Sequence, residues 1–239
     1  MMKIDQQKLF FIIAPDRSGT TLLQAIMNTF SGFCNTIESR MFGRDSLSCW
    51  VPVMQTQDFS YLEKFIEDNW TAEFFVEKSP PSIMCLPEIY KKFPDANFIF
   101  LERHPEKILL SQMNLFREVS ENGKRKDDLG DIMLEEDNAI LNHEFIMARR
   151  LYRMILNQVE FKHLFNKKIT IRYENIINSL DSQISLLEKT FGIQGNLKNA
   201  QVCLSKPSIS ASFRYGLRGI SDKQAIAMIN LANQLWNYD

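Results

Sequence analysis

The sequence lacks an excess of charge of either sign. Lysine and arginine together number 28 and aspartate and glutamate 29, so the 239-residue chain has a net charge of -1. Proteins that bind a nucleic-acid backbone usually carry excess positive charge, because they must neutralise its phosphates. A nucleic-acid partner is therefore disfavoured. With 45% hydrophobic residues, the chain can bury one substantial core, and we expect a single domain over residues 1–239.

Cysteine and histidine are scarce and show no metal-binding pattern. The four cysteines contain no CxxC pair, and the three histidines lack the spacing of a zinc site. The first residues do not form the apolar run of a signal peptide, and no apolar stretch approaches the roughly 20 residues that span a bilayer. We therefore expect reduced thiols, a cytoplasmic location and no integral membrane segment.

Two common catalytic sequences are also missing. The chain does not place the Gly-Lys pair of GxxxxGK[ST] in its glycine turn, which argues against an ordinary ATP or GTP hydrolase. It has no GxSxG turn, so a Ser-His-Asp hydrolase has no support.

Short apolar runs alternate with helical patterns along the whole chain. Strands are expected at 8–14, 74–78, 97–101 and 168–173, and helices at 22–27, 105–120, 137–165, 180–191 and 221–236. This alternation predicts an α/β fold with three layers, in which helices flank both faces of a mostly parallel central sheet. Ligands of such folds bind at the carboxyl ends of the strands.

The first strand leads through a polar turn into a helix. The turn contains Arg17, Ser18, Gly19, Thr20 and Thr21. Backbone N–H groups at the start of a helix form an anion site, to which an arginine and hydroxyl groups add donors. A phosphate or a related oxyanion is the expected guest, whereas the alternative is a plain helix start with an exposed arginine.

A second anion site is predicted after the strand at 97–101. Arg103 follows this strand, and Ser111 lies eight residues later on the next helix. An arginine fork together with a hydroxyl suits a phosphate monoester. The alternative is a surface pair between Arg103 and Glu102 or Glu106.

Four segments in order resemble one known family. Residues 17–23, RSGTTLL, are similar to the 5′-phosphosulfate loop of sulfotransferases that use 3′-phosphoadenosine-5′-phosphosulfate (PAPS). Residues 98–105 together with Ser111 resemble that family's 3′-phosphate site, and residues 172–176 and 213–216 are similar to two later segments. The RSGTT motif is similar to that of the Golgi-like and bacterial branch of the family. The fold that the resemblance implies is like that of P-loop nucleotide transferases.

The resemblance implies how the donor is held. The 17–21 loop would bind its 5′ end, with Arg17 stabilising the departing phosphate. Arg103 and Ser111, with Arg214 and Gly216, would bind the 3′-phosphate, and Arg218 is the rival of Arg214. Tyr173 would contact the adenine, unless it is an ordinary packing residue. No metal is implied.

The resemblance also implies two further catalytic groups. Glu38, in Glu38-Ser39-Arg40 after a short predicted strand at 35–37, would be the base toward the acceptor; the alternative is a solvated acid paired with Arg40. Lys78 would be a second cation near the transferring group. Its alternative is a surface ion pair with Glu77, which the alternation of side chains along a strand disfavours.

We therefore expect a sulfotransferase that transfers a sulfuryl group from PAPS to a hydroxyl or amine. A P-loop small-molecule or nucleotide kinase, which would need Mg²⁺, and a catalytically silent nucleotide-binding module are the alternatives. The acceptor is expected to contact residues 42–61, which include Trp50, Phe59 and Tyr61, and the charged loop at 121–130. It could be a small metabolite, a carbohydrate, a lipid-like molecule, a natural-product phenol or a peptide tyrosine. The oligomeric state stays open.

Overall fold

The computed structural model describes residues 4–33, 44–121, 143–205 and 220–238. The chain forms two compact units, each built from two stretches of sequence: Met1–Glu102 with Asn157–Ser208, and Arg103–Leu156 with Ile209–Asp239. We describe each unit by itself. The expectation of a single domain stays a prediction.

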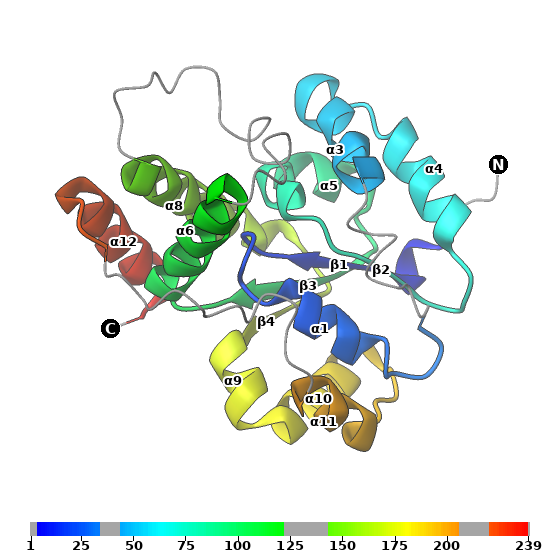
Figure 1. Ribbon diagram of the computed structural model, residues 1–239. Helices are drawn as coiled ribbons and strands as arrows, with labels where there is room; N and C mark the ends of the chain where they lie inside the picture. The colour runs from blue at the N-terminus through cyan, green and yellow to red at the C-terminus, as the bar shows by residue number, and fades with distance from the viewer. Residues whose placement is uncertain (1–3, 34–43, 122–142, 206–219, 239) are drawn as a thin grey trace. The chain divides into compact units, whose positions relative to one another are not determined.

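The first unit is built on a parallel sheet of four strands. β1 (Leu9–Ile13), β2 (Phe75–Glu77), β3 (Asn97–Glu102) and β4 (Lys168–Arg172) lie in the order β2-β1-β3-β4 (Figure 1). All three neighbouring pairs are parallel, with Phe11 opposite both Glu77 and Phe98. The four predicted strands are therefore confirmed. Parallel strands end at one edge, so the residues that follow them gather there.

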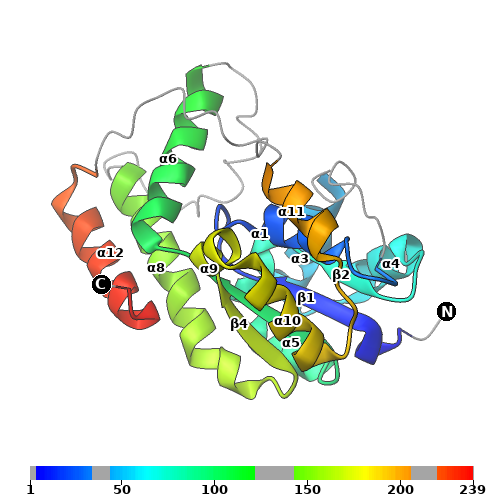
Figure 2. The same ribbon diagram turned by 90° about the horizontal axis from the view of Figure 1, so that it is seen from below.

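Helices cover both faces of this sheet. On one face lie α1 (Thr20–Met27), α9 (Tyr173–Asn178), α10 (Leu180–Phe191) and α11 (Leu197–Ser205), the side seen in Figure 2. On the other lie α3 (Arg44–Thr56), α4 (Ser60–Asn69) and α5 (Leu86–Lys92) (Figure 1). The predicted three-layer α/β architecture is confirmed. Three short 3-10 helices, η1 (Gln6–Lys8), η2 (Pro80–Met84) and η3 (Lys162–Leu164), complete the described elements of this unit.

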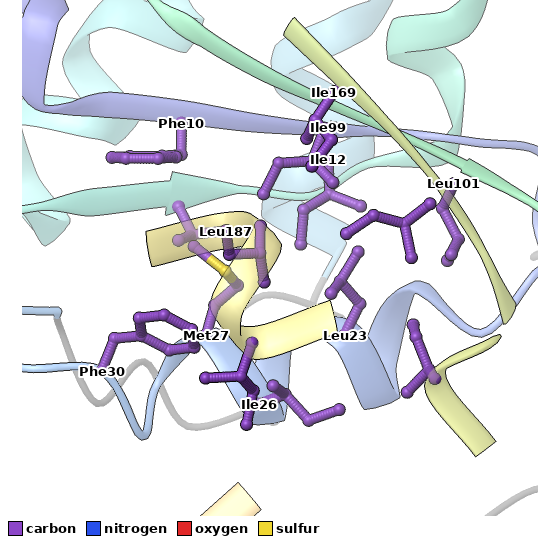
Figure 3. Packing of buried hydrophobic residues seen from close by; sticks show 14 of the residues in the cluster. Phe10, Ile12, Leu23, Ile26, Met27, Phe30, Ile99, Leu101, Ile169 and Leu187 are labelled. Atoms are coloured by element: carbon purple, nitrogen blue, oxygen red, sulfur yellow. The ribbon is translucent and has the colours of Figure 1, made fainter. Parts of the chain in front are cut away.

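Both faces of the sheet are packed with apolar side chains. On one face, residues of β1, β3 and β4 meet α1 and α10, including Ile12, Ile99, Leu23 and Leu187 (Figure 3). On the other face, Phe11 and Phe98 are stacked at 5.4 Å between ring centroids. Strands β1, β2 and β3 are buried throughout, as continuous apolar runs predict, because both faces of a covered parallel sheet are shielded from water.

The described part of the second unit is helical. It contains α6 (Pro105–Glu121), α12 (Lys223–Trp236) and most of α8 (His143–Phe161), whose last residues, from Asn157, belong to the first unit. Glu144 of α8 accepts hydrogen bonds from the backbone N–H groups of Ser221 and Asp222, at 2.9 and 2.8 Å. Asp222 in turn caps α12. A carboxylate at this position also complements the positive end of α12.

The residues between the first helix and β2 differ from the expectation. The segment at 42–61 was expected to be an acceptor-binding region of loop character, but α3 and the start of α4 occupy most of its described part. Pro52 lies inside α3. No helix among the described residues is both long and apolar enough to cross a membrane.

Candidate active site

The turn between β1 and α1 has the geometry of an anion site. The N-cap of α1 is Gly19, with φ of 97°, so no N-cap side chain covers the first N–H groups of the helix. Arg17 also has a left-handed backbone, with φ of 70°. This conformation is unfavourable for a residue with a side chain and is typical of functional turns. The sequence prediction of a strand, a turn and a helix at 8–27 is confirmed.

The hydroxyl of Ser18 lies inside this turn without a partner. Ser18 is completely buried, and its Oγ makes no hydrogen bond with any residue that the structure describes. A buried polar atom of this kind calls for a partner beyond the described residues. An oxyanion in the turn would accept its hydrogen bond. The donor set therefore fits the predicted 5′ phosphate or phosphosulfate group.

Tyr173 lies directly against the turn. It is the first residue of α9, immediately after β4. A Cβ atom built on Gly19 would stand only 2.6 Å from Cε2 of the Tyr173 ring, a distance that real Cβ atoms essentially never show. Glycine is thus required at position 19 both by its backbone conformation and by the ring beside it. The structure brings together two residues that are 154 positions apart in the sequence.

Lys78 reaches the same turn from β2. Its Nζ donates a hydrogen bond to Oγ1 of Thr21, at 3.1 Å, and only 4% of the residue is exposed. Glu77 is equally buried, so the alternative of a surface ion pair between these neighbours is wrong. The carboxyl end of β2 thus delivers a cation to the start of α1.

The side chain of Glu77 contacts Trp50, not the turn that Lys78 reaches. Its Oε1 accepts a hydrogen bond from Nε1 of Trp50, at 3.1 Å, whereas its Oε2 has no partner of full hydrogen-bond geometry within the described ranges. Burial raises the pKa of Glu77 to about 7, although Ser79, Trp50 and the charge of Lys78 all favour the carboxylate. Trp50 was expected near the acceptor, but it is completely buried against this carboxylate.

The predicted 3′-phosphate residues belong to the second unit. Arg103 is the residue after the last residue of β3, and Ser111 lies on α6, as expected; both are half-buried. One alternative paired Arg103 with Glu102. The carboxylate of Glu102 meets Lys162 at 3.2 Å and Arg172 at 3.9 Å, and the choice between this alternative and a phosphate site stays a prediction.

Several predicted site residues lie outside the described residues. They are the proposed base Glu38 with Arg40, the candidate 3′-phosphate residues Arg214 and Gly216, and the rival Arg218. The predicted strand at 35–37 and nearly all of the acceptor loop at 121–130 lie outside them as well. Within the part that is described, no group of three or more His, Cys, Asp or Glu side chains is arranged to hold a metal ion.

Comparison with known proteins assigns the chain to a family. The model of the sulfotransferase family matches residues 41–196, which is more than half of the chain. The chain belongs to the sulfotransferase family. The sequence-based expectation of a sulfotransferase is confirmed, and the kinase alternative is not supported. The matched range contains Glu77, Lys78, Arg103, Ser111 and Tyr173, whereas the turn at 17–21 precedes it.

Solved structures of sulfotransferases share the fold of this one. A sulfotransferase from Mycobacterium avium is similar with a TM-score of 0.62 and 10% identity, covering 99% of this chain and 78% of that chain. A sulfotransferase from Alicyclobacillus acidocaldarius gives 0.54 and 12%, with 96% of each chain covered. A mouse sulfotransferase complexed with PAP gives 0.53 and 14%, covering 98% and 79%. No curated protein sequence matches the chain.

One feature of this sulfotransferase was missed by sequence reasoning. The pair of Trp50 and Glu77 joins residues 27 positions apart, and no local pattern marks it. The only sequence feature that pointed to this pair was the charge of Glu77 in a strand, β2, that is otherwise apolar. An acid at the end of a fully buried strand needs a partner, and a search for an indole, hydroxyl or cation elsewhere in the chain would have been justified.

The raised pKa of Glu77 makes the stability of this sulfotransferase depend on pH. Unfolding lowers this pKa from about 7 to its ordinary value of 4.5, so between these values the unfolded state holds fewer protons than the folded state. The contribution of Glu77 to the free energy of unfolding is therefore largest below pH 4.5 and is lost as the pH rises through 7. Glu77→Gln removes the titration and keeps an acceptor oxygen for Trp50. We expect the variant to gain up to about 3 kcal/mol over the wild type at pH 8 and almost nothing at pH 4.5.

Urea unfolding at pH 3, 4.5 and 8 measures the difference in free energy of unfolding between variant and wild type. The matched control is Asp58→Asn, because the Ser60 amide and hydroxyl lower the pKa of the exposed Asp58. This control should lose stability, and more at pH 8 than at pH 3. An equal effect of Glu77→Gln at pH 4.5 and pH 8 would contradict the argument.

Proposed function

We propose that this sulfotransferase uses PAPS as its donor and transfers the sulfuryl group to a hydroxyl or amine of a small molecule, a carbohydrate or a natural product. The observation that carries the proposal is the 3.1 Å contact between Lys78 Nζ and Thr21 Oγ1. It unites two residues to which the family resemblance gives independent roles at the 5′ end of the donor. The mouse relative complexed with PAP supports the choice of nucleotide.

The donor supplies a sulfuryl group on a 5′-phosphate oxygen, and the turn at 17–21 holds that end. The N–H groups at the start of α1 and the Ser18 hydroxyl donate hydrogen bonds to its oxygens. Arg17 and Lys78 stabilise the negative charge that grows on the phosphate as the sulfur–oxygen bond breaks. Thr21 keeps the Lys78 ammonium beside the turn.

Other residues hold the rest of the nucleotide. Tyr173, whose ring already lies against Gly19, contacts the adenine. Arg103 and Ser111, together with Arg214 and Gly216, bind the 3′-phosphate. Glu38 takes the proton from the acceptor as its oxygen or nitrogen attacks sulfur. None of these roles calls for a metal ion.

Binding of 3′-phosphoadenosine-5′-phosphate (PAP) tests the donor. We expect PAP to stabilise the fold by about 2.7 kcal/mol at 100 times its Kd, and AMP to stabilise it less at the same concentration because AMP lacks the 3′-phosphate. Melting scans with each nucleotide, with and without Mg²⁺, measure both effects. Stabilisation by ATP with Mg²⁺ in preference to PAP would favour a kinase and sink the proposal.

The arginine after β3 gives a sharper test of the 3′-phosphate site. Arg103→Ala removes a charge-assisted hydrogen bond to that group, so the Kd of PAP should rise by about tenfold or more while the Kd of AMP stays nearly constant. Calorimetry measures both constants, and Arg214→Ala should behave alike. Arg153→Ala, an exposed arginine of α8, is the control. Equal losses for PAP and AMP would show that Arg103 has another role.

The assignment of the base predicts a separation of rate from binding. Glu38→Gln keeps the size of the side chain but removes its basicity, so turnover with an alcohol acceptor should fall by about 10² to 10⁴ while the Kd of PAP is unchanged. A screen of acceptor classes with labelled PAPS supplies the alcohol. Turnover close to that of the wild type would mean that another group takes the proton.

A further inference from the structure

Strand β2 is short where it approaches the active site. Among the described strands it has three residues, stands at one end of the strand order and pairs with β1. Glu77, opposite Phe11, is its last paired residue. Lys78 follows immediately, so the ladder of strand pairing ends just before the residue that reaches the turn. Side-chain contacts beyond the ladder with β1 therefore bear on the position of Lys78.

The side chains at this end of β2 are held from two opposite directions. Glu77 accepts its hydrogen bond from Trp50 of α3, and Lys78 donates its own to Thr21 of α1. Helices α3 and α1 lie on opposite faces of the sheet (Figure 1), as expected for neighbouring residues of a strand. All four residues belong to the first unit. Glu77 and Lys78 are thus each hydrogen-bonded to a helix on a different face of the sheet.

The segment after Lys78 is fixed as well. The backbone N–H and the hydroxyl of Ser82 both donate to the carbonyl oxygen of Ser79, at 3.0 and 2.7 Å. The chain therefore enters η2 at Pro80, two residues beyond Lys78. Glu77, the other neighbour of Lys78, is held by its pairing with Phe11 and, through its side chain, by the hydrogen bond from Trp50.

Stability alone does not account for this pair. Glu77 is buried so completely that its pKa rises to about 7, which means that the ionised carboxylate destabilises the fold at neutral pH. A hydrophobic side chain of similar volume would pack in the same place without that penalty. The Trp50 hydrogen bond favours the carboxylate and so offsets part of this penalty. The presence of a buried acid at this position is more readily explained by a demand for one defined geometry.

We propose that Trp50 is a positioning residue of the active site: its hydrogen bond to Glu77 fixes the carboxyl end of β2 and thereby holds the Lys78 ammonium at Thr21. This role rests on the proposed function in one respect, namely that Lys78 contacts the 5′ end of the donor. Trp50 itself touches neither donor nor acceptor in this scheme.

A double-mutant cycle with PAP as the probe tests the proposal. Trp50→Phe keeps an aromatic ring but removes the N–H donor, and Lys78→Met removes the cation. We expect Lys78→Met to raise the Kd of PAP by about tenfold or more and Trp50→Phe to raise it by at least about fivefold. The double variant should bind within about twofold of Lys78→Met, because Trp50 acts through Lys78.

Two controls separate positioning from a general loss of structure. Glu77→Gln keeps the oxygen that accepts from Trp50, so PAP should bind within about twofold of the wild type. Trp70→Phe is the matched tryptophan: its Nε1 donates to the Ala72 carbonyl at 2.8 Å, and its ring stacks on Phe75 of the same strand. This change should leave the Kd of PAP unaltered. Should Trp50→Phe fail to fold, Glu77→Met removes the acceptor from the other side and replaces it in the cycle.

The outcomes are distinct. A normal Kd for Trp50→Phe, or additive losses in the double variant, would overturn the positioning role while leaving the proposed function intact. Failure of the wild type to bind PAP would instead overturn the proposed function, and the positioning role with it. Non-additive losses, with normal binding by Glu77→Gln and Trp70→Phe, would establish Trp50 as a positioning residue.

Discussion

The contact between Gly19 and the ring of Tyr173 is the constraint on which the rest of the active site depends. A left-handed residue between β1 and α1 brings the N–H groups of the helix to the edge of the sheet, and only glycine adopts that conformation without strain. The ring then fills the space that any other side chain would need. Turn, helix start and the end of β4 are thereby fixed relative to one another by close packing rather than by a flexible hydrogen bond.

The carboxyl edge of the sheet concentrates charge in a hydrophobic surrounding. Lys78, Glu77 and Glu102 are nearly inaccessible to water, yet each follows or ends a strand that is mostly apolar. Each charge is met by a residue that is distant in the sequence: Thr21, Trp50, and the pair Lys162 and Arg172. Buried charges without such partners would prevent folding. The arrangement thus links the stability of the first unit to the geometry of its functional edge.

Sequence reasoning succeeded where local patterns decide structure. Continuous apolar runs identified β1, β2 and β3, the alternation of Ile169 and Ile171 with polar residues identified β4, and Gly192 marked the end of α10, where its φ is 69°. It failed at α3, because loop character was expected there from the role of loops in acceptor specificity, whereas the segment forms a helix that buries Trp50 and Val53. Propensity is a weak predictor where tertiary contacts oppose it.

The sequence by itself determined the class of fold, the family and the identity of the residues that could bind an oxyanion, because apolar periodicity and the motif at 17–21 are local properties of the chain. Only the tertiary structure decided which residues the active-site side chains contact. That Lys78 meets Thr21 instead of forming a surface pair, that Tyr173 covers Gly19, and that Trp50 is buried against Glu77 all follow from the order of strands and from which helices cover each face. Strand alternation predicts the face of the sheet to which a side chain points. Which residue it contacts on that face is determined by packing between segments far apart in the sequence.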